Sequence, residues 1–160
     1  MTSFKAWTVI SLSLVVCLLL QIMPLPMWAI WYRPEWIVLA LIYWALVQPE
    51  RVGVTIAFIM GLFMDLLTGT LLGQHALAYT VIIYFTLRFY PLLRQFPAWQ
   101  QAVLIFFFML LFETFQLWIW GIRGGRSFSW MYWLPCIMSA LIWPWMYGIM
   151  KIYQKHYRLY

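Results

Sequence analysis

The chain has 160 residues, of which 66% are hydrophobic and only 9% are charged. A soluble domain has about a quarter of its residues charged, so these side chains cannot form a water-facing surface. The composition therefore predicts a chain that lies in lipid. Its aromatic residues, 21% of the chain, are expected to form belts at both membrane surfaces. The net charge of +6 is carried mostly between apolar runs, without the basic stripe of a nucleic-acid-binding protein. Cys17 and Cys136 both lie inside apolar runs and are interpreted as buried thiols.

The first predicted membrane span covers residues 6–23 and follows Lys5. A cleaved signal peptide is the alternative, but the proline-rich residues 24–28 follow in place of a small-x-small cleavage site. This favours an uncleaved helix. Gln21, near the end of the span, is expected to pair with a neighbouring helix.

An aromatic interfacial loop at residues 28–36 leads into the second predicted span, residues 34–48. Proline is favoured in the first turn of a helix, so this helix is expected to begin near Pro34 and to end before Pro49. About 15 helical residues cover only ~22 Å, which is short of the ~30 Å hydrocarbon core of a bilayer. The span is therefore either short, with local thinning of the bilayer, or shielded by protein.

The third predicted span, residues 53–67, begins a stripe of small or acidic residues at every fourth position. Four-residue spacing places side chains on one face of a helix, so the stripe is expected to form a groove with one carboxylate in it. Its members are Gly53, Ala57, Gly61, Asp65, Gly69 and Gly73. Thr-Gly-Thr at residues 68–70 is expected to break the helix. Asp65 then lies at a helix end beside a glycine turn, and this corner is predicted to be central to function.

The fourth predicted span covers residues 74–90 and the fifth covers residues 102–122, with Glu113 near the middle of the fifth. Between them, residues 91–101 mix two prolines, an arginine and several hydrophobic residues. That pattern is typical of a segment that lies on the membrane surface.

The sixth predicted span covers residues 131–151 and is expected to be interrupted by Pro135 and Pro144. We predict an all-α integral membrane protein in which residues 1–160 form one six-helix transmembrane domain. With both ends of the chain in the cytoplasm, seven basic residues lie inside: Lys5, Arg51, Arg88, Arg94, Lys151, Lys155 and Arg158. Three lie outside: Arg33, Arg123 and Arg126. This excess agrees with the positive-inside rule.

Asp65 and Glu113 are the two acids that the spans place at membrane depth. An ionised carboxylate there costs at least ~2.5 kcal/mol, so each is expected to face the bundle and to have a partner. Two interpretations stay open for both: contact with a ligand, ion or partner protein, or a structural carboxylate bonded to backbone amides or a neighbouring helix. His75, near the outer surface, is interpreted as a polar anchor. Three glycines either expose backbone to a ligand or permit close helix packing: Gly61, Gly69 and Gly73.

The sequence contains no histidine–acid–serine set, no metal-ligand spacing and no phosphate-binding loop. We therefore expect neither an enzyme nor a bound cofactor or metal. Polar residues are also too sparse to line an ion pathway.

Several of these motifs, in this order and spacing, resemble the MreD family of rod shape-determining membrane proteins. They are Arg33-Pro34-x-Trp36, Gly61-x-x-x-Asp65, Leu72-Gly73-x-x-Ala76-Leu77, Glu113 and Trp143-Pro144-Trp145. The likeness in hydropathy and length covers the whole chain, and the specific motifs cover about a third of it.

The resemblance implies a six-helix protein of the bacterial inner membrane, similar in fold to the S components of energy-coupling-factor transporters. It also implies a role in cell elongation, with the partners MreC, MreB, and RodA with its penicillin-binding transpeptidase. No catalytic residue is carried over from the family. The glycine stripe is predicted to receive the membrane helix of MreC.

Two functions compete at this point, and a third, a lipid-processing enzyme, would need a polar reaction site that the sequence does not show. The first is a non-enzymatic membrane scaffold of the elongation complex, in contact with membrane lipids. The second is a ligand-binding transport component with an outer pocket around Asp65 and Glu113. A closed, protein-filled core at Asp65 would favour the scaffold, and a water-filled cavity that opens outward would favour the transport component.

Overall fold

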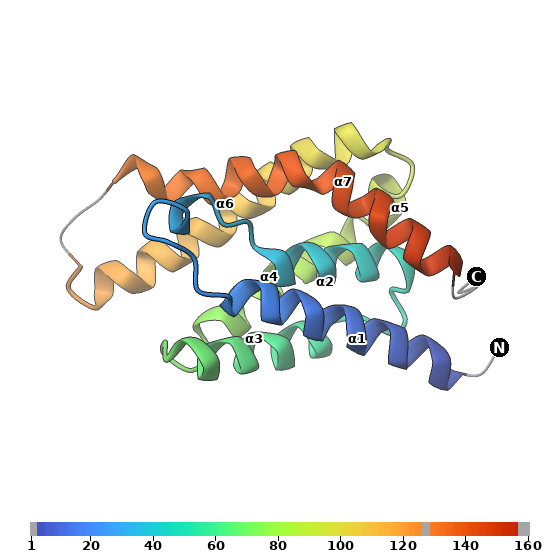
Figure 1. Ribbon diagram of the computed structural model, residues 1–160, viewed down its shortest axis with the longest axis horizontal. Helices are drawn as coiled ribbons and strands as arrows, with labels where there is room; N and C mark the ends of the chain where they lie inside the picture. The colour runs from blue at the N-terminus through green and yellow to red at the C-terminus, as the bar shows by residue number, and fades with distance from the viewer. Residues whose placement is uncertain (1–2, 126–128, 157–160) are drawn as a thin grey trace.

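Helices form the regular structure in the described part of the chain, residues 3–125 and 129–156 of a computed structural model (Figure 1). In chain order they are α1 (Ser3–Ile22), η1 (Ile30–Tyr32), α2 (Trp36–Val47), α3 (Val54–Thr68), α4 (Gln74–Arg88), α5 (Tyr90–Leu93), α6 (Ala98–Ile122), η2 (Trp130–Trp133) and α7 (Leu134–His156). The all-α prediction is confirmed. Arg126 and Arg158, which the topology prediction uses, lie outside the described residues.

Four helical stretches within the described residues are long and apolar enough to cross a membrane. They are Phe4–Ile22, Ile30–Val47, Ala98–Ile122 and Trp130–His156. Helix α3 is also apolar, but its 15 residues cover only ~22 Å. Helix α4 has the same length. The fold is therefore that of a membrane protein with four candidate spans, and six spans remain a prediction.

The six longer helices of the described chain run alternately in opposite directions (Figure 1). The two ends of the chain lie at one end of the bundle, together with the α2–α3 turn and α5 (Figure 1). We call this the terminal end. The α1–α2, α3–α4 and α6–α7 connections lie at the other end, which we call the loop end (Figure 1).

Helix α2 is the centre of the fold. All ten residues from Ile37 to Leu46 are buried, none more than 4% exposed. A helix that is apolar on every side is stable in this way only when it is surrounded, and α2 contacts α1, α4, α5 and α7. The short second span could either thin the bilayer locally or be shielded by protein. The fold shows that it is shielded by protein.

Helix α2 begins at Trp36, two residues later than the expected start at Pro34. The backbone N–H groups at the junction bond to side chains of other helices. Glu35 N–H donates to Ser139 Oγ (3.1 Å) and Trp36 N–H donates to Gln21 Oε1 (2.9 Å). The chain stays non-helical up to Glu35, because these bonds fix the beginning of α2 at Trp36.

Two expectations from proline positions are wrong. Pro135 does not interrupt the last helix, because it lies in the first turn of α7, where its missing N–H has no intrahelical role. Pro144 lies inside α7, which continues as one helix to His156. Residues 91–101 pack against the bundle: Leu93 is only 2% exposed, and Gln101 Nε2 donates to the carbonyls of Leu93 (3.0 Å) and Phe96 (3.2 Å). Their place at a membrane surface stays a prediction.

Helices α3 and α4 share the most extensive helix–helix contact of the described chain, and the middle of the stripe faces this contact. Ala57, Gly61 and Asp65 are all buried. A side-chain carbon at Gly61 would overlap the backbone of Ala76 and come within 2.8 Å of the carbonyl carbon of His75. The expectation of an open groove is thereby corrected at Ala57, Gly61 and Asp65, which α4 of the same chain covers.

We predict that Gly61→Ala destabilises the protein by at least ~1–3 kcal/mol, because the added methyl group forces two backbones apart. Gly148→Ala is the control, since a Cβ at this position in α7 has no atom within 4 Å. Alanine there is neutral or stabilising by up to ~1 kcal/mol. Thermal unfolding of both variants in detergent measures the difference. Equal midpoints for the two would contradict the close α3–α4 contact.

Candidate functional site

Asp65 lies in the last turn of α3, at the loop end, and is only 1% exposed. Gly69 ends the helix in the left-handed conformation (φ 65°), where glycine carries no steric penalty. The Asp65 carbonyl accepts the N–H groups of Gly69 and Thr70, which closes the end of the helix. The prediction of a helix break at residues 68–70, with Asp65 beside a glycine turn, is confirmed.

The Asp65 carboxylate binds the beginning of the next helix. Its Oδ1 accepts the His75 N–H (2.9 Å) and the Thr70 hydroxyl (2.9 Å). Its Oδ2 accepts the N–H of Gly73 (2.8 Å) and, more weakly, that of Ala76 (3.4 Å). The first N–H groups of a helix have no partner within it and carry a partial positive charge, so a carboxylate satisfies both needs. Asp65 of α3 is therefore the N-terminal cap of α4.

The His75 side chain completes this corner. Its Nδ1 lies 2.8 Å from Asp65 Oδ1, and because an ionised carboxylate can only accept, Nδ1 donates the proton. The His75 ring is also in edge contact with Tyr79 (centroids 5.9 Å) and is tilted against Phe112 (6.1 Å). His75 thus joins α3, α4 and α6, as the interpretation of a polar anchor expects.

A second polar group surrounds the beginning of α2. Gln21 of α1 is 2% exposed, and its Nε2 donates to Glu35 Oε2 (3.1 Å) while its Oε1 accepts from Trp36. Ser139 of α7 accepts from the Glu35 backbone. The expected pairing of Gln21 with a neighbouring helix is confirmed, and three helices meet at this junction.

Glu113 and Tyr79 are two further buried polar residues of the bundle. Glu113 of α6 is 8% exposed and lies within electrostatic range of Glu35. Tyr79 is fully buried, and its hydroxyl lies in the field of Glu35, Asp65 and Arg33. This hydroxyl has no hydrogen-bond partner among the described residues. We call these buried groups together the polar zone, and its residues belong to α1, α2, α3, α4, α6 and α7.

The remaining predicted site residues occupy different places. Arg33 ends η1 and lies near Glu35, and Pro34 is buried beside it. Pro144 is half-buried inside α7, and the tryptophans next to it point opposite ways: Trp143 is fully buried and Trp145 is 78% exposed. Pro144 thus lies apart from the Asp65 corner in the chain, and no described contact joins the two.

Reasoning from the sequence missed Glu35, Thr70 and Ser139 as partners in the polar zone. Glu35 was assigned to an interfacial loop, although an acid directly before an apolar run is favoured at a helix start by the helix dipole. Ser139 had a weaker signal. It lies three residues after Cys136, so that two small side chains share one face of an otherwise bulky helix.

The chemistry open to this zone is limited. Both Asp65 oxygens are occupied by donors from its own chain, which leaves little capacity for a ligand. Within the described residues there is no group of three His, Cys, Asp or Glu side chains that could hold a metal. The arrangement is that of helix caps and interhelical bonds.

We predict that Asp65→Ala loses at least ~3 kcal/mol of stability, because the N–H groups of Gly73, His75 and Ala76 lose their acceptor, at ~1–3 kcal/mol each. Asp65→Asn keeps one acceptor oxygen and should lose less. Hydrogen exchange at residues 73–76 and thermal unfolding in detergent measure the effects. Glu50→Ala, at an exposed turn, is the control. Unchanged exchange at the beginning of α4 in Asp65→Ala would disprove the capping role.

Comparison with known proteins gives a consistent result. The family model described as rod shape-determining protein MreD matches residues 1–153. Rod shape-determining protein MreD of Haemophilus influenzae is 29% identical over 154 residues, which cover 96% of this chain and 95% of that protein. No solved structure matches. The chain belongs to the MreD family of rod shape-determining membrane proteins.

Proposed function

We propose that this protein is a non-enzymatic scaffold of the bacterial cell-elongation complex, and that it supports lateral peptidoglycan synthesis through association with MreC. Membership of a rod shape-determining family supports a role in cell shape. The observation that carries the scaffold role is the use of interior polar groups: Asp65, Gln21 and Ser139 each bond to the beginning of another helix. Such groups hold helices in place and leave no open reaction site.

The alternative, a ligand-binding transport component, has less support. The Asp65 carboxylate is enclosed and bonded within the chain. Neither of the two cavities described below is lined by Asp65 or Glu113. By the criterion of a closed core, the scaffold is favoured.

We place the protein in the bacterial inner membrane as a multi-pass protein of six spans with both ends in the cytoplasm. The distribution of basic residues supports this orientation. Six described basic residues belong to segments at the terminal end: Lys5, Arg51, Arg88, Arg94, Lys151 and Lys155. Arg33 and Arg123 belong to segments at the loop end. The terminal end would then face MreB, and RodA with its transpeptidase would be met within the bilayer.

An apolar groove between α1 and α7 is the surface that we assign to the membrane helix of MreC. Its volume is about 570 Å³. It is lined by Leu12, Ser13, Val16, Cys17, Leu20, Trp36, Ile142, Trp145, Met146, Ile149, Met150 and Tyr153. Ser13 and Cys17, four residues apart, are small side chains of the kind that let a second helix approach closely. We assign MreC to this groove rather than to the glycine stripe, because α4 covers the middle of the stripe at Gly61.

We predict that Val16→Trp reduces co-purification of MreC and produces rounded cells when it replaces the native protein in a rod-shaped bacterium. The indole would fill the groove. Val15→Trp is the matched control, because Val15 is a neighbour of similar exposure (51% against 47%) that does not line the groove. The readouts are MreC recovered from detergent extracts and the cell aspect ratio.

Three outcomes are informative. Loss with Val16→Trp alone supports the groove. Equal behaviour of the two variants, with MreC still bound, would place the partner elsewhere. Normal rods after complete depletion of the protein would contradict the scaffold function itself.

A further inference from the structure

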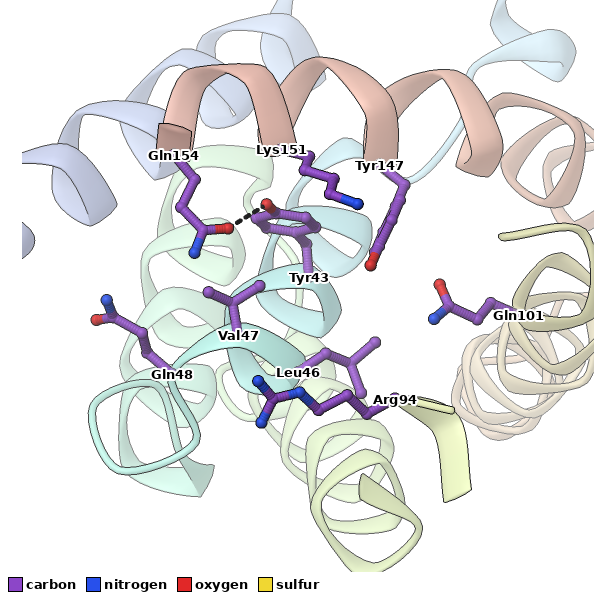
Figure 2. Close-up of a pocket in the computed structure, with 9 residues that line it drawn as sticks. All are labelled: Tyr43, Leu46, Val47, Gln48, Arg94, Gln101, Tyr147, Lys151 and Gln154. Carbon is purple, nitrogen blue, oxygen red and sulfur yellow. Dashed lines mark hydrogen bonds between the residues drawn. The ribbon is translucent and has the colours of Figure 1, made fainter. Parts of the chain in front are cut away.

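A second cavity, of about 340 Å³, opens at the terminal end of the bundle. Figure 2 shows that side chains from the end of α2, the end of α7 and the α5–α6 region surround it. It is lined by Tyr43, Leu46, Val47, Gln48, Arg94, Gln101, Tyr147, Lys151 and Gln154. Unlike the groove between α1 and α7, it combines polar side chains with two cations.

The cations have no acidic partner in the described chain. No carboxylate of the described residues forms an ion pair with Arg94 or Lys151. One guanidinium nitrogen of Arg94 donates to the Tyr90 hydroxyl (2.7 Å), and its Cζ lies 5.9 Å from the centre of the Tyr90 ring. Arginine has five N–H donors, so this contact positions the group and leaves most of its donors for a ligand.

The walls of the cavity are fixed by hydrogen bonds of their own. The Tyr43 hydroxyl donates to Gln154 Oε1 (2.9 Å), a bond drawn in Figure 2. Gln101 is 2% exposed, and its Oε1 accepts from Trp143 Nε1 (3.1 Å) while its Nε2 bonds to Leu93 and Phe96. These bonds hold α2, α6 and α7 at set positions, so the cavity is formed before any ligand enters.

We infer that this cavity binds the phosphate of an anionic phospholipid headgroup, with Arg94 and Lys151 on the phosphate. An arginine and a lysine that line one cavity without a carboxylate partner are suited to an anion. Leu46 and Val47 add apolar surface beside the cations, which suits a lipid better than a soluble phosphate. The cavity also lies at the terminal end, beside the end of α2 and the last turns of α7. In the orientation proposed above, on which this inference rests, that end faces the cytoplasmic headgroups.

The test is native mass spectrometry of the intact protein in detergent with added phosphatidylglycerol or phosphatidylcholine. We expect retention of phosphatidylglycerol over phosphatidylcholine. Each cation removed should weaken binding about fivefold, so Arg94→Gln with Lys151→Gln should weaken it about 25-fold. The control is Arg88→Gln with Lys155→Gln, which removes the same charge from residues that do not line the cavity.

A charge-conserving pair, Arg94→Lys with Lys151→Arg, should keep most of the binding. Its binding shows that substitution at these two positions does not by itself unfold the protein. Equal retention of the two lipids would overturn the inference, as would equal loss in the lining and control pairs. Glycerol 1-phosphate is added as a competitor. If it displaces phosphatidylglycerol at equal concentration, the ligand is a soluble phosphate and the lipid assignment is wrong.

Discussion

The enclosure of α2 is the constraint on which the rest of the structure depends. A helix that is apolar on every side has no polar face to orient it. Its position is therefore fixed by its contacts with neighbouring helices. Its ends are a different matter, since unpaired backbone groups are costly wherever water is absent. Gln21 and Ser139 resolve this at its beginning, and they tie α1 and α7 to the same point.

The same solution recurs at α4. Asp65 does for α4 what Gln21 and Ser139 do for α2, and in each case the capping side chain comes from a different helix. In a soluble protein a cap is usually the residue just before its helix. Here the cap is also a tertiary contact, so that a few polar residues specify which helices are neighbours.

The sequence was sufficient to predict local features of the chain, but not which helices pack against one another. Gly69 and Asp65 could be placed because a helix break and the acid beside it are local properties of the chain. The helix that packs against Gly61 could not be predicted, because α4 and the membrane helix of a partner protein are equally apolar. For the same reason the central position of α2 could not be read from periodicity: lipid-facing and buried residues are alike. Glu35 was missed because its partners lie 14 and 104 residues away.

The position of α2 has a consequence for how the protein is made. One of the helices that enclose it, α7, begins 98 positions after α2 does, so it is synthesised after α1, α4 and α5, the other helices that α2 contacts. Until α7 is made, the side of α2 that α7 covers remains uncovered. A chain that stops before residue 134 therefore lacks one of the helices that bury α2, and its central helix stays partly uncovered.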